Sequence, residues 1–176
     1  MRRFGGKYTG VVPTIEHKEL VQRAFSYLKF SFGCGVVFKE RVASVSETPD
    51  AIGFKHGFSY LIECKASRAD FLSDKNKNFR KDPSQGMGYQ RYYMSPVGML
   101  EPSEIPEGWG LLEVYEIPPR QRNRTVNIAK ESKRFFEGER NLAAEVSYLV
   151  SAIRRLNISM AVFVEPEQSK EKTDGQ

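Results

Sequence analysis

The sequence predicts one mixed α/β (α+β) domain, built in the order helix, three strands, helix, strand, with an added C-terminal hairpin and helix. Three observations predict this class. Apolar residues recur at helical spacing in residues 15–30 and 139–157. Runs of β-branched and aromatic residues between turn signals indicate strands. The chain has 176 residues, 40% hydrophobic and 28% charged, which is enough for one domain with a core.

The N-terminal third of the chain predicts a leader, a helix and a strand. Residues 1–13 are glycine-rich and end at a proline, so we expect a flexible leader. Thr14 is the expected N-cap of an amphipathic helix over 15–30, which the "GCG" at 33–35 ends. Residues 35–46 then alternate as a strand does.

The next stretch predicts a hairpin followed at once by a second helix. Residues 50–55 and 58–66 read as strands, and "KHG" between them is a turn signal. Ser67 precedes Asp70 by three residues, the spacing of a helix N-terminus, and the helix that follows becomes strongly basic.

The C-terminal half predicts a fourth strand over 89–97, a hairpin from 109–117 to "TVNIAK", and a helix over 139–157. The apolar side of this helix holds Leu142, Val146, Leu149, Ile153 and Leu156. The domain is expected to span residues 14–164, and the polar residues 165–176 to form a disordered tail.

The charge and the cysteine content indicate which partners and which redox compartment to expect for the protein. The net charge is +5 with a pI near 9.2, which permits a polyanionic partner without requiring one. Cys34 and Cys64 lie in apolar runs outside any C-x-x-C pair, so we expect free buried thiols in a reducing compartment. No run approaches the ~18 apolar residues of a membrane span, so we expect a cytoplasmic protein without membrane contact.

A possible metal site lies in the hairpin stretch "TPDAIGFKHGFSYLIECKAS" (48–67). Side chains alternate along a strand, so Glu63 and Lys65 share one face while Cys64 points to the other. The hairpin brings Asp50 near the end of the same strand. Two carboxylates beside one ammonium favour a hard divalent cation, which Mg²⁺ chemistry fits. Taken singly, Asp50 is more typical of a turn, and Glu63 with Lys65 of a solvated edge-strand pair; together, in this order of elements, they favour the metal site.

These residues resemble the PD-(D/E)XK nuclease superfamily, whose restriction-endonuclease-like core has the same order of elements. The match is Pro49-Asp50 followed by Glu63-x-Lys65, and it covers roughly residues 14–97. More narrowly, "ECKASRADFLSDKNKNFR" and "GMGYQRYYMSP" look like small phage and bacterial members.

The resemblance implies roles for individual residues. Asp50 and Glu63 would bind Mg²⁺ or Mn²⁺, the backbone carbonyl of Cys64 would join them, and Lys65 would assist the attacking water. An acidic residue of the first helix commonly completes such a site; Glu16 and Glu19 are both candidates, and Glu19 lies deeper in the helix.

The basic residues after the motif are candidates for nucleic-acid binding through phosphates. They are Arg68, Lys75, Lys77, Arg80, Lys81 and Arg91. A solvated helix face explains the same run equally well.

The sequence therefore predicts a metal-dependent deoxyribonuclease that hydrolyses DNA phosphodiester bonds, with a non-cleaving DNA-binding or regulatory protein on the same fold as the alternative. Many members of the superfamily cut duplexes as homodimers, so a homodimer is one expected state.

Overall fold

The strands form one mixed sheet whose spatial order follows the order of the chain. The computed structural model describes residues 12–39, 48–74, 77–116 and 126–155. The order is β1-β2-β3-β4-β5-β6, with parallel pairing of β3–β4 and β4–β5 and antiparallel pairing elsewhere. The strands are β1 (Val36–Lys39), β2 (Ala51–Lys55), β3 (Phe58–Cys64), β4 (Gln90–Pro96), β5 (Gly110–Val114) and β6 (Val126–Lys130). The predicted mixed α+β class is confirmed.

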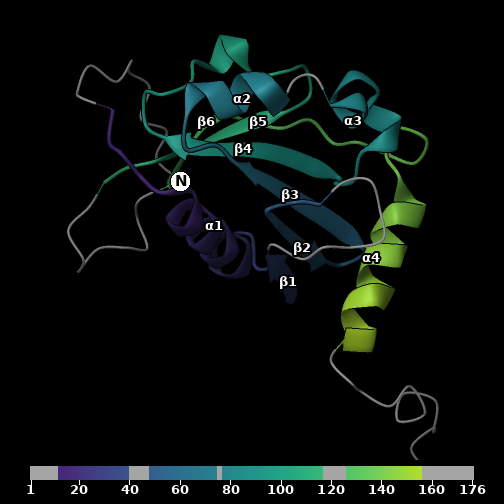
Figure 1. Cartoon of the computed structure of the whole chain (residues 1–176). Helices are drawn as coiled ribbons and strands as arrows, with labels where there is room; N and C mark the ends of the chain where they lie inside the picture. The colour runs from purple at the N-terminus through teal and green to yellow at the C-terminus, as the bar shows by residue number, and fades with distance from the viewer. Residues whose placement is uncertain (1–11, 40–47, 75–76, 117–125, 156–176) are drawn as a thin grey trace, which may run out of the picture.

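Helices cover both faces of this sheet (Figure 1). One face carries α1 (His17–Ser26), continued by a π-helical turn, η1 (Tyr27–Ser31). The opposite face carries α2 (Arg68–Asp74) and α3 (Asn78–Lys81). The last helix, α4 (Leu142–Arg155), packs on the same face as α2, because its Tyr148 belongs to the same core. Short 3₁₀ turns, η2 (Pro83–Gln85) and η3 (Pro102–Glu104), lie in the connections.

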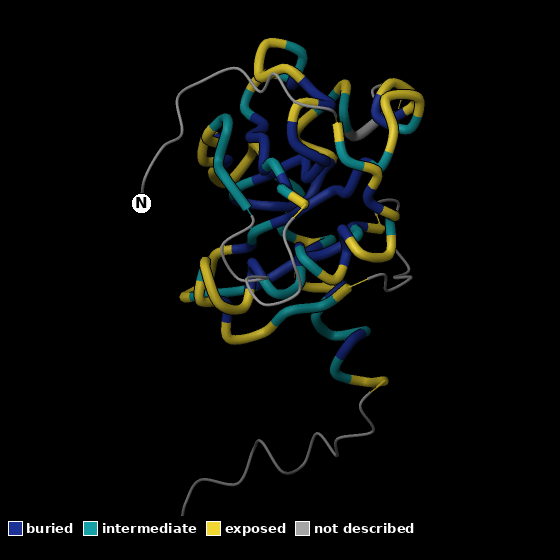
Figure 2. Tube along the Cα trace, turned by 90° about the vertical axis from the view of Figure 1, so that its left-hand side faces the viewer, coloured by how far each residue is buried: buried dark blue, intermediate teal, exposed yellow. Residues whose placement is uncertain are grey.

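Two hydrophobic cores follow from the alternation of side chains along the strands. Ile62 and Cys64 of β3 face Leu20 and Ala24 of α1 in the first core. Leu61, one residue earlier, joins Phe71 of α2 in the second. Figure 2 shows the buried residues gathered in the middle of the molecule, between outer layers that are exposed.

The β2–β3 hairpin fixes the register that the candidate site needs. His56 and Gly57 both have positive φ, 49° and 79°, as a two-residue type I′ turn requires. Ala51 then pairs with Ile62, and Lys55 with Phe58. Residues that follow Ile62 in β3 therefore lie beside the start of β2.

Several predicted element boundaries are wrong. The first helix begins at His17, and its N-cap is Glu16, so Thr14 does not cap it. The basic helix after Ser67 is divided into α2 and α3. On α4 the buried residues are Glu145, Tyr148 and Ala152, whereas Val146 of the predicted apolar side is 58% exposed.

Other predictions lie outside the described residues or agree with them. Residues 1–11, the end of the strand predicted over 35–46, and the tail 165–176 are among those the structure does not describe. The thiols of Cys34 and Cys64 are buried and are not joined in a disulfide, as predicted. In the described part of the chain, no helix is long and apolar enough to cross a membrane.

Candidate functional site

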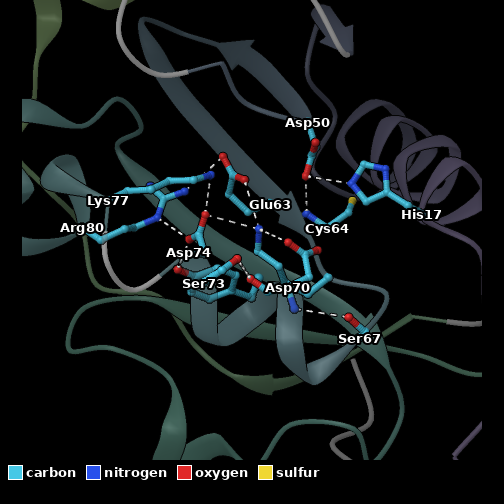
Figure 3. A network of polar contacts seen from close by, with 12 residues as sticks. His17, Asp50, Glu63, Cys64, Ser67, Asp70, Ser73, Asp74, Lys77 and Arg80 are labelled. Atoms are coloured by element: carbon cyan, nitrogen blue, oxygen red, sulfur yellow. Dashed lines mark hydrogen bonds and ion pairs between the residues drawn. The ribbon is translucent and has the colours of Figure 1, made fainter.

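Asp50 lies at the open end of the β2–β3 hairpin, immediately before β2. Its Oδ2 accepts a hydrogen bond from the backbone N–H of Cys64 at 2.8 Å, which ties it to the end of β3. The same oxygen lies 3.4 Å from Nε2 of His17 on α1 (Figure 3). The side chain of Asp50 is 20% exposed, so this carboxylate is within reach of solvent.

Glu63 and Lys65 lie on the α2 face of the sheet, as their spacing predicts. Each side chain is only 4% exposed. Nζ of Lys65 lies 3.7 Å from Oε2 of Glu63, 3.7 Å from Oδ1 of Asp70 and 3.3 Å from Oδ1 of Asp74. A solvated edge-strand pair is therefore excluded, because a buried ammonium lies among three carboxylates.

Asp74, at the end of α2, is the acceptor on which this cluster centres. Its side chain is fully buried. Oδ2 accepts hydrogen bonds from Nε of Arg80 and from the hydroxyl of Tyr93, each at 2.7 Å. Oδ1 lies 2.6 Å from Nζ of Lys77 (Figure 3). Because desolvation strengthens such contacts, Asp74 holds residues of β3, α3 and β4 in one arrangement.

Arg80 connects Asp74 to Glu63. Its Nη2 lies 3.1 Å from Oε1 of Glu63, while its Nε binds Asp74. The guanidinium lies 4.3 Å from the ring centroid of Trp109, whose ring stacks on Tyr93. This side chain is 2% exposed. Arg80 is thus enclosed by two carboxylates and an aromatic ring.

Burial and charge shift the pKa values in this cluster. Burial alone would raise the pKa of Asp74, but the charge of Arg80 and the hydrogen bonds from Lys77 and Arg80 hold it well below its ordinary range. Burial raises the pKa of Tyr93 well above its usual value against the opposing charge of Arg80, and its bond to Asp74 adds to the rise. Burial would lower the pKa of Lys77, yet its bond to Asp74 and the charge of Glu63 raise it.

We call Glu63, Lys65, Asp70, Asp74, Lys77 and Arg80 the ion network. Its three carboxylates are matched by three cations, so its formal charge is zero. Within the ranges that the structure describes, no group of three or more His, Cys, Asp or Glu side chains is arranged to hold a metal ion. The carboxylates of Asp50 and Glu63 each have protein partners of their own.

The first helix brings a different residue to Asp50 than predicted. Glu16 is the exposed N-cap of α1. Glu19 is 55% exposed, and its Oε1 accepts from Nε of Arg23 at 3.1 Å. The α1 side chain at Asp50 is His17.

The residues predicted to contact phosphates differ in their exposure and in their partners within the protein. Lys77 is 47% exposed, and Lys81 is exposed one helical turn later. Arg68, 52% exposed, pairs with Glu104 and donates to the carbonyl of Met99 at 2.9 Å. Lys75 lies outside the described residues.

The prediction of a phosphate contact for Arg91 is wrong. The residue is 1% exposed. Its Nη2 donates to the carbonyls of Pro83 and Gly86 at 2.9 Å each, and its guanidinium lies 4.0 Å from the ring centroid of Phe135. Its charge therefore holds the loop before β4 to the core and does not reach the surface.

Two features of the site were not predicted from the sequence: the part played by Asp74, and the buried position of Arg80 between Asp74 and Glu63. A signal was present for Asp74, because Asp70 and Asp74 are four residues apart on a short helix and so share a face. No comparable pattern marks Arg80, since its approach to Glu63 depends on how α3 follows α2.

The fold and the site together define a mixed α+β domain with a largely buried ion network between the end of β3 and the helices α2 and α3. The chain is similar in fold to the SPO1766 protein of unknown function from Silicibacter pomeroyi, with a TM-score of 0.54 and 19% identity over 89% of this chain and 100% of that one. No family model and no curated protein matches the sequence. At this identity the likeness concerns the fold alone.

Proposed function

We propose that this protein is a metal-dependent nuclease of the PD-(D/E)XK type, which hydrolyses DNA phosphodiester bonds on a restriction-endonuclease-like core. One observation carries the proposal. Asp50 is bonded to the end of β3 beside Glu63, and Lys65 follows on the same face as Glu63. Pro49-Asp50 and Glu63-x-Lys65 resemble the motif of that superfamily, and the order of elements from α1 to β4 supports the proposal.

The donor set fits a small hard cation. Mg²⁺ and Mn²⁺ favour oxygen ligands, and Mg²⁺ usually keeps several waters while using one or two carboxylates together with substrate phosphates. Asp50 and Glu63 would hold the ion, with the Cys64 carbonyl as a third oxygen. Two carboxylates suffice for such an ion, so the lack of a three-residue cluster among the described residues does not oppose it.

When bound, the metal would supply Lewis acidity and a more acidic water. The chain's own residues would supply the rest. Lys65 keeps its ammonium among the carboxylates of Glu63, Asp70 and Asp74, where it would orient water or offset negative charge that grows on a phosphate. Lys77 and Lys81, both exposed, would receive the DNA backbone beside the site.

Cleavage of DNA tests this proposal directly. The purified protein would be incubated with Mn²⁺ and labelled single-stranded, duplex or branched DNA, beside the variants Asp50→Asn and Lys65→Met. Each variant should lower the rate by about 10²–10³-fold, the usual cost of a lost electrostatic group in a site. Asn at position 50 can still accept from Cys64, so folding should survive this change.

Exposed residues of like chemistry provide matched controls. Glu107 and Lys18 are exposed and belong neither to the ion network nor to the proposed metal ligands, so Glu107→Gln and Lys18→Met should cleave as the wild type does. If all three DNA forms stay intact with Mn²⁺, or if Asp50→Asn and Lys65→Met cleave at the wild-type rate, the nuclease proposal is wrong.

The neutrality of the ion network favours a second candidate, a DNA-binding or regulatory protein that does not cut. The positive charges of Arg80 and Lys65 both lie beside the carboxylate of Glu63, so this carboxylate needs no metal ion to balance its charge. This candidate predicts salt-sensitive DNA binding by the wild type, with no cleavage under any metal and no change in binding for Asp50→Asn.

A further inference from the structure

Arg80 lies where it neutralises Glu63 inside the folded protein. Its Nη2 is 3.1 Å from Oε1 of Glu63, and neither side chain is more than 4% exposed. An arginine keeps its charge at every accessible pH, so this positive charge can leave Glu63 only if the side chain moves. A metal ion that approached Glu63 would therefore meet a fixed cation beside its ligand.

Asp74 and Trp109 hold Arg80 independently of Glu63. The Nε of Arg80 binds Asp74 at 2.7 Å, and its guanidinium lies 4.3 Å from the Trp109 ring centroid. Loss of the contact to Glu63 would thus leave the arginine anchored. A terminal nitrogen released from Glu63 would be available to donate to another anion, and an oxygen of a tetrahedral phosphate is such an acceptor.

The network meets solvent close to this arginine. Asp70 is 43% exposed and Lys77 is 47% exposed, whereas Lys65 and Asp74 beneath them are buried. Lys81 follows Arg80 directly and is exposed. A phosphate drawn to Lys77 and Lys81 would arrive beside Arg80.

We propose that Arg80 is an internal counter-ion of Glu63, which competes with the divalent cation for this carboxylate and is released to a DNA phosphate. The inference rests on the proposed nuclease function and adds a regulation to it. In the absence of DNA the site has low affinity for metal, because Arg80 offsets the charge of its ligand. A bound phosphate takes over Arg80, so DNA and metal strengthen each other's binding by the same factor.

Metal affinity without DNA is the test, because it needs no activity. Binding of Mn²⁺ would be measured by calorimetry for the wild type and Arg80→Gln, with thermal melts to establish folding. We expect Arg80→Gln to bind Mn²⁺ about tenfold more tightly, within the range usual for coupled sites. A merely structural arginine predicts unchanged or weaker binding.

Three further variants make the result specific. Lys29→Gln removes an exposed positive charge outside the ion network and should change Mn²⁺ affinity by less than about twofold, since exposed charges are screened. Arg80→Lys keeps the charge and tests whether Arg80→Gln acts through charge alone; it should stay close to the wild type. In a Glu63→Gln background, Arg80→Gln should have no effect on Mn²⁺ affinity, because the ligand for which Arg80 competes is gone.

The outcomes separate this inference from the proposed function. If Arg80→Gln fails to tighten Mn²⁺ binding while the wild type cleaves DNA, the counter-ion role is overturned and the nuclease stands. If Arg80→Gln tightens binding and no version cleaves, the counter-ion role is supported and the nuclease proposal falls. Absence of Mn²⁺ binding in both proteins would overturn both.

Discussion

At the scale of single residues, Asp74 contributes more to the order of the candidate site than the motif residues do. It accepts from Arg80 and Tyr93 through one oxygen and pairs with Lys77 and Lys65 through the other. A buried carboxylate is costly unless it is paired and hydrogen-bonded, and Asp74 is both. Its loss would leave buried cations without a partner.

We therefore expect Asp74→Asn to lower the free energy of unfolding by about 3–5 kcal/mol at neutral pH, the usual cost of breaking a buried ion pair. Chemical denaturation at several pH values measures this. The folded-state pKa of Asp74 lies below its unfolded value near 3.9. Its stabilisation is therefore fully present above about pH 4 and is lost as pH falls through the lower folded-state pKa, so the two proteins should converge in acid.

Asp70→Asn is the matched control, because Asp70 also lies near Lys65 but is 43% exposed. An exposed pair contributes about 0–1 kcal/mol, so this variant should stay close to the wild type at every pH. A cost for Asp70→Asn as large as that for Asp74→Asn would show that burial does not govern the network.

The candidate site could be predicted from sequence only where local rules determine it. Alternation places Glu63 with Lys65, and a two-residue turn fixes Asp50 beside the end of β3. The partners of these residues come from elsewhere: His17 from α1 and Arg80 from α3. Spacing within one element carries no information on such contacts, so it predicts neither His17 as the α1 residue at Asp50 nor Arg80 as the partner of Glu63.

At the scale of elements, the strands were predicted better than the helices. Each described strand lies in a stretch with a clear alternation or an apolar run, bounded by turn residues. On α4, hydrophobicity alone indicated the wrong side. Glu145 is buried there because Arg140 pairs with it and the N–H of Gly88 donates to it at 2.9 Å. A buried pair of this kind cannot be inferred from an apolar stripe.

The packing of β4 against β5 gives a test at the same scale. A Cβ on Gly110 would lie 2.4 Å from Cδ1 of Tyr92 and 2.7 Å from the carbonyl oxygen of Lys130. Gly110→Ala should therefore lower the free energy of unfolding by at least about 1–3 kcal/mol, as overpacking of a core does. Urea denaturation measures the loss.

Gly35→Ala serves as its control. A Cβ at Gly35, just before β1, meets no atom within 4 Å. Its stability should change by less than about 1 kcal/mol. Equal stabilities of the two variants would show that β4 and β5 tolerate separation at Gly110.

At the scale of the whole molecule, the net charge of +5 is compatible with the proposed DNA binding, which should weaken as salt rises. Anisotropy of a labelled duplex, measured across a salt series, gives the slope of log affinity against log salt. Lys77→Gln and Lys81→Gln should each reduce this slope by about 0.9 if each side chain contacts one phosphate.

Arg91→Gln should behave in the opposite way. Its charge is bound to backbone carbonyls, so the variant should lose thermal stability and keep the wild-type salt slope. A reduced slope for Arg91→Gln, or unchanged slopes for both lysine variants, would mean that the DNA lies elsewhere on the protein.

The sequential strand order has a consequence for how the protein folds. In the described sheet, each strand pairs with the strand that precedes it in the chain. A two-residue turn joins β2 to β3, and closing so short a loop costs little entropy. The described members of the ion network and Asp50 all lie within residues 50–80. We therefore expect this region to assemble as the chain leaves the ribosome, with β4 added next and β5 and β6 closing the sheet last.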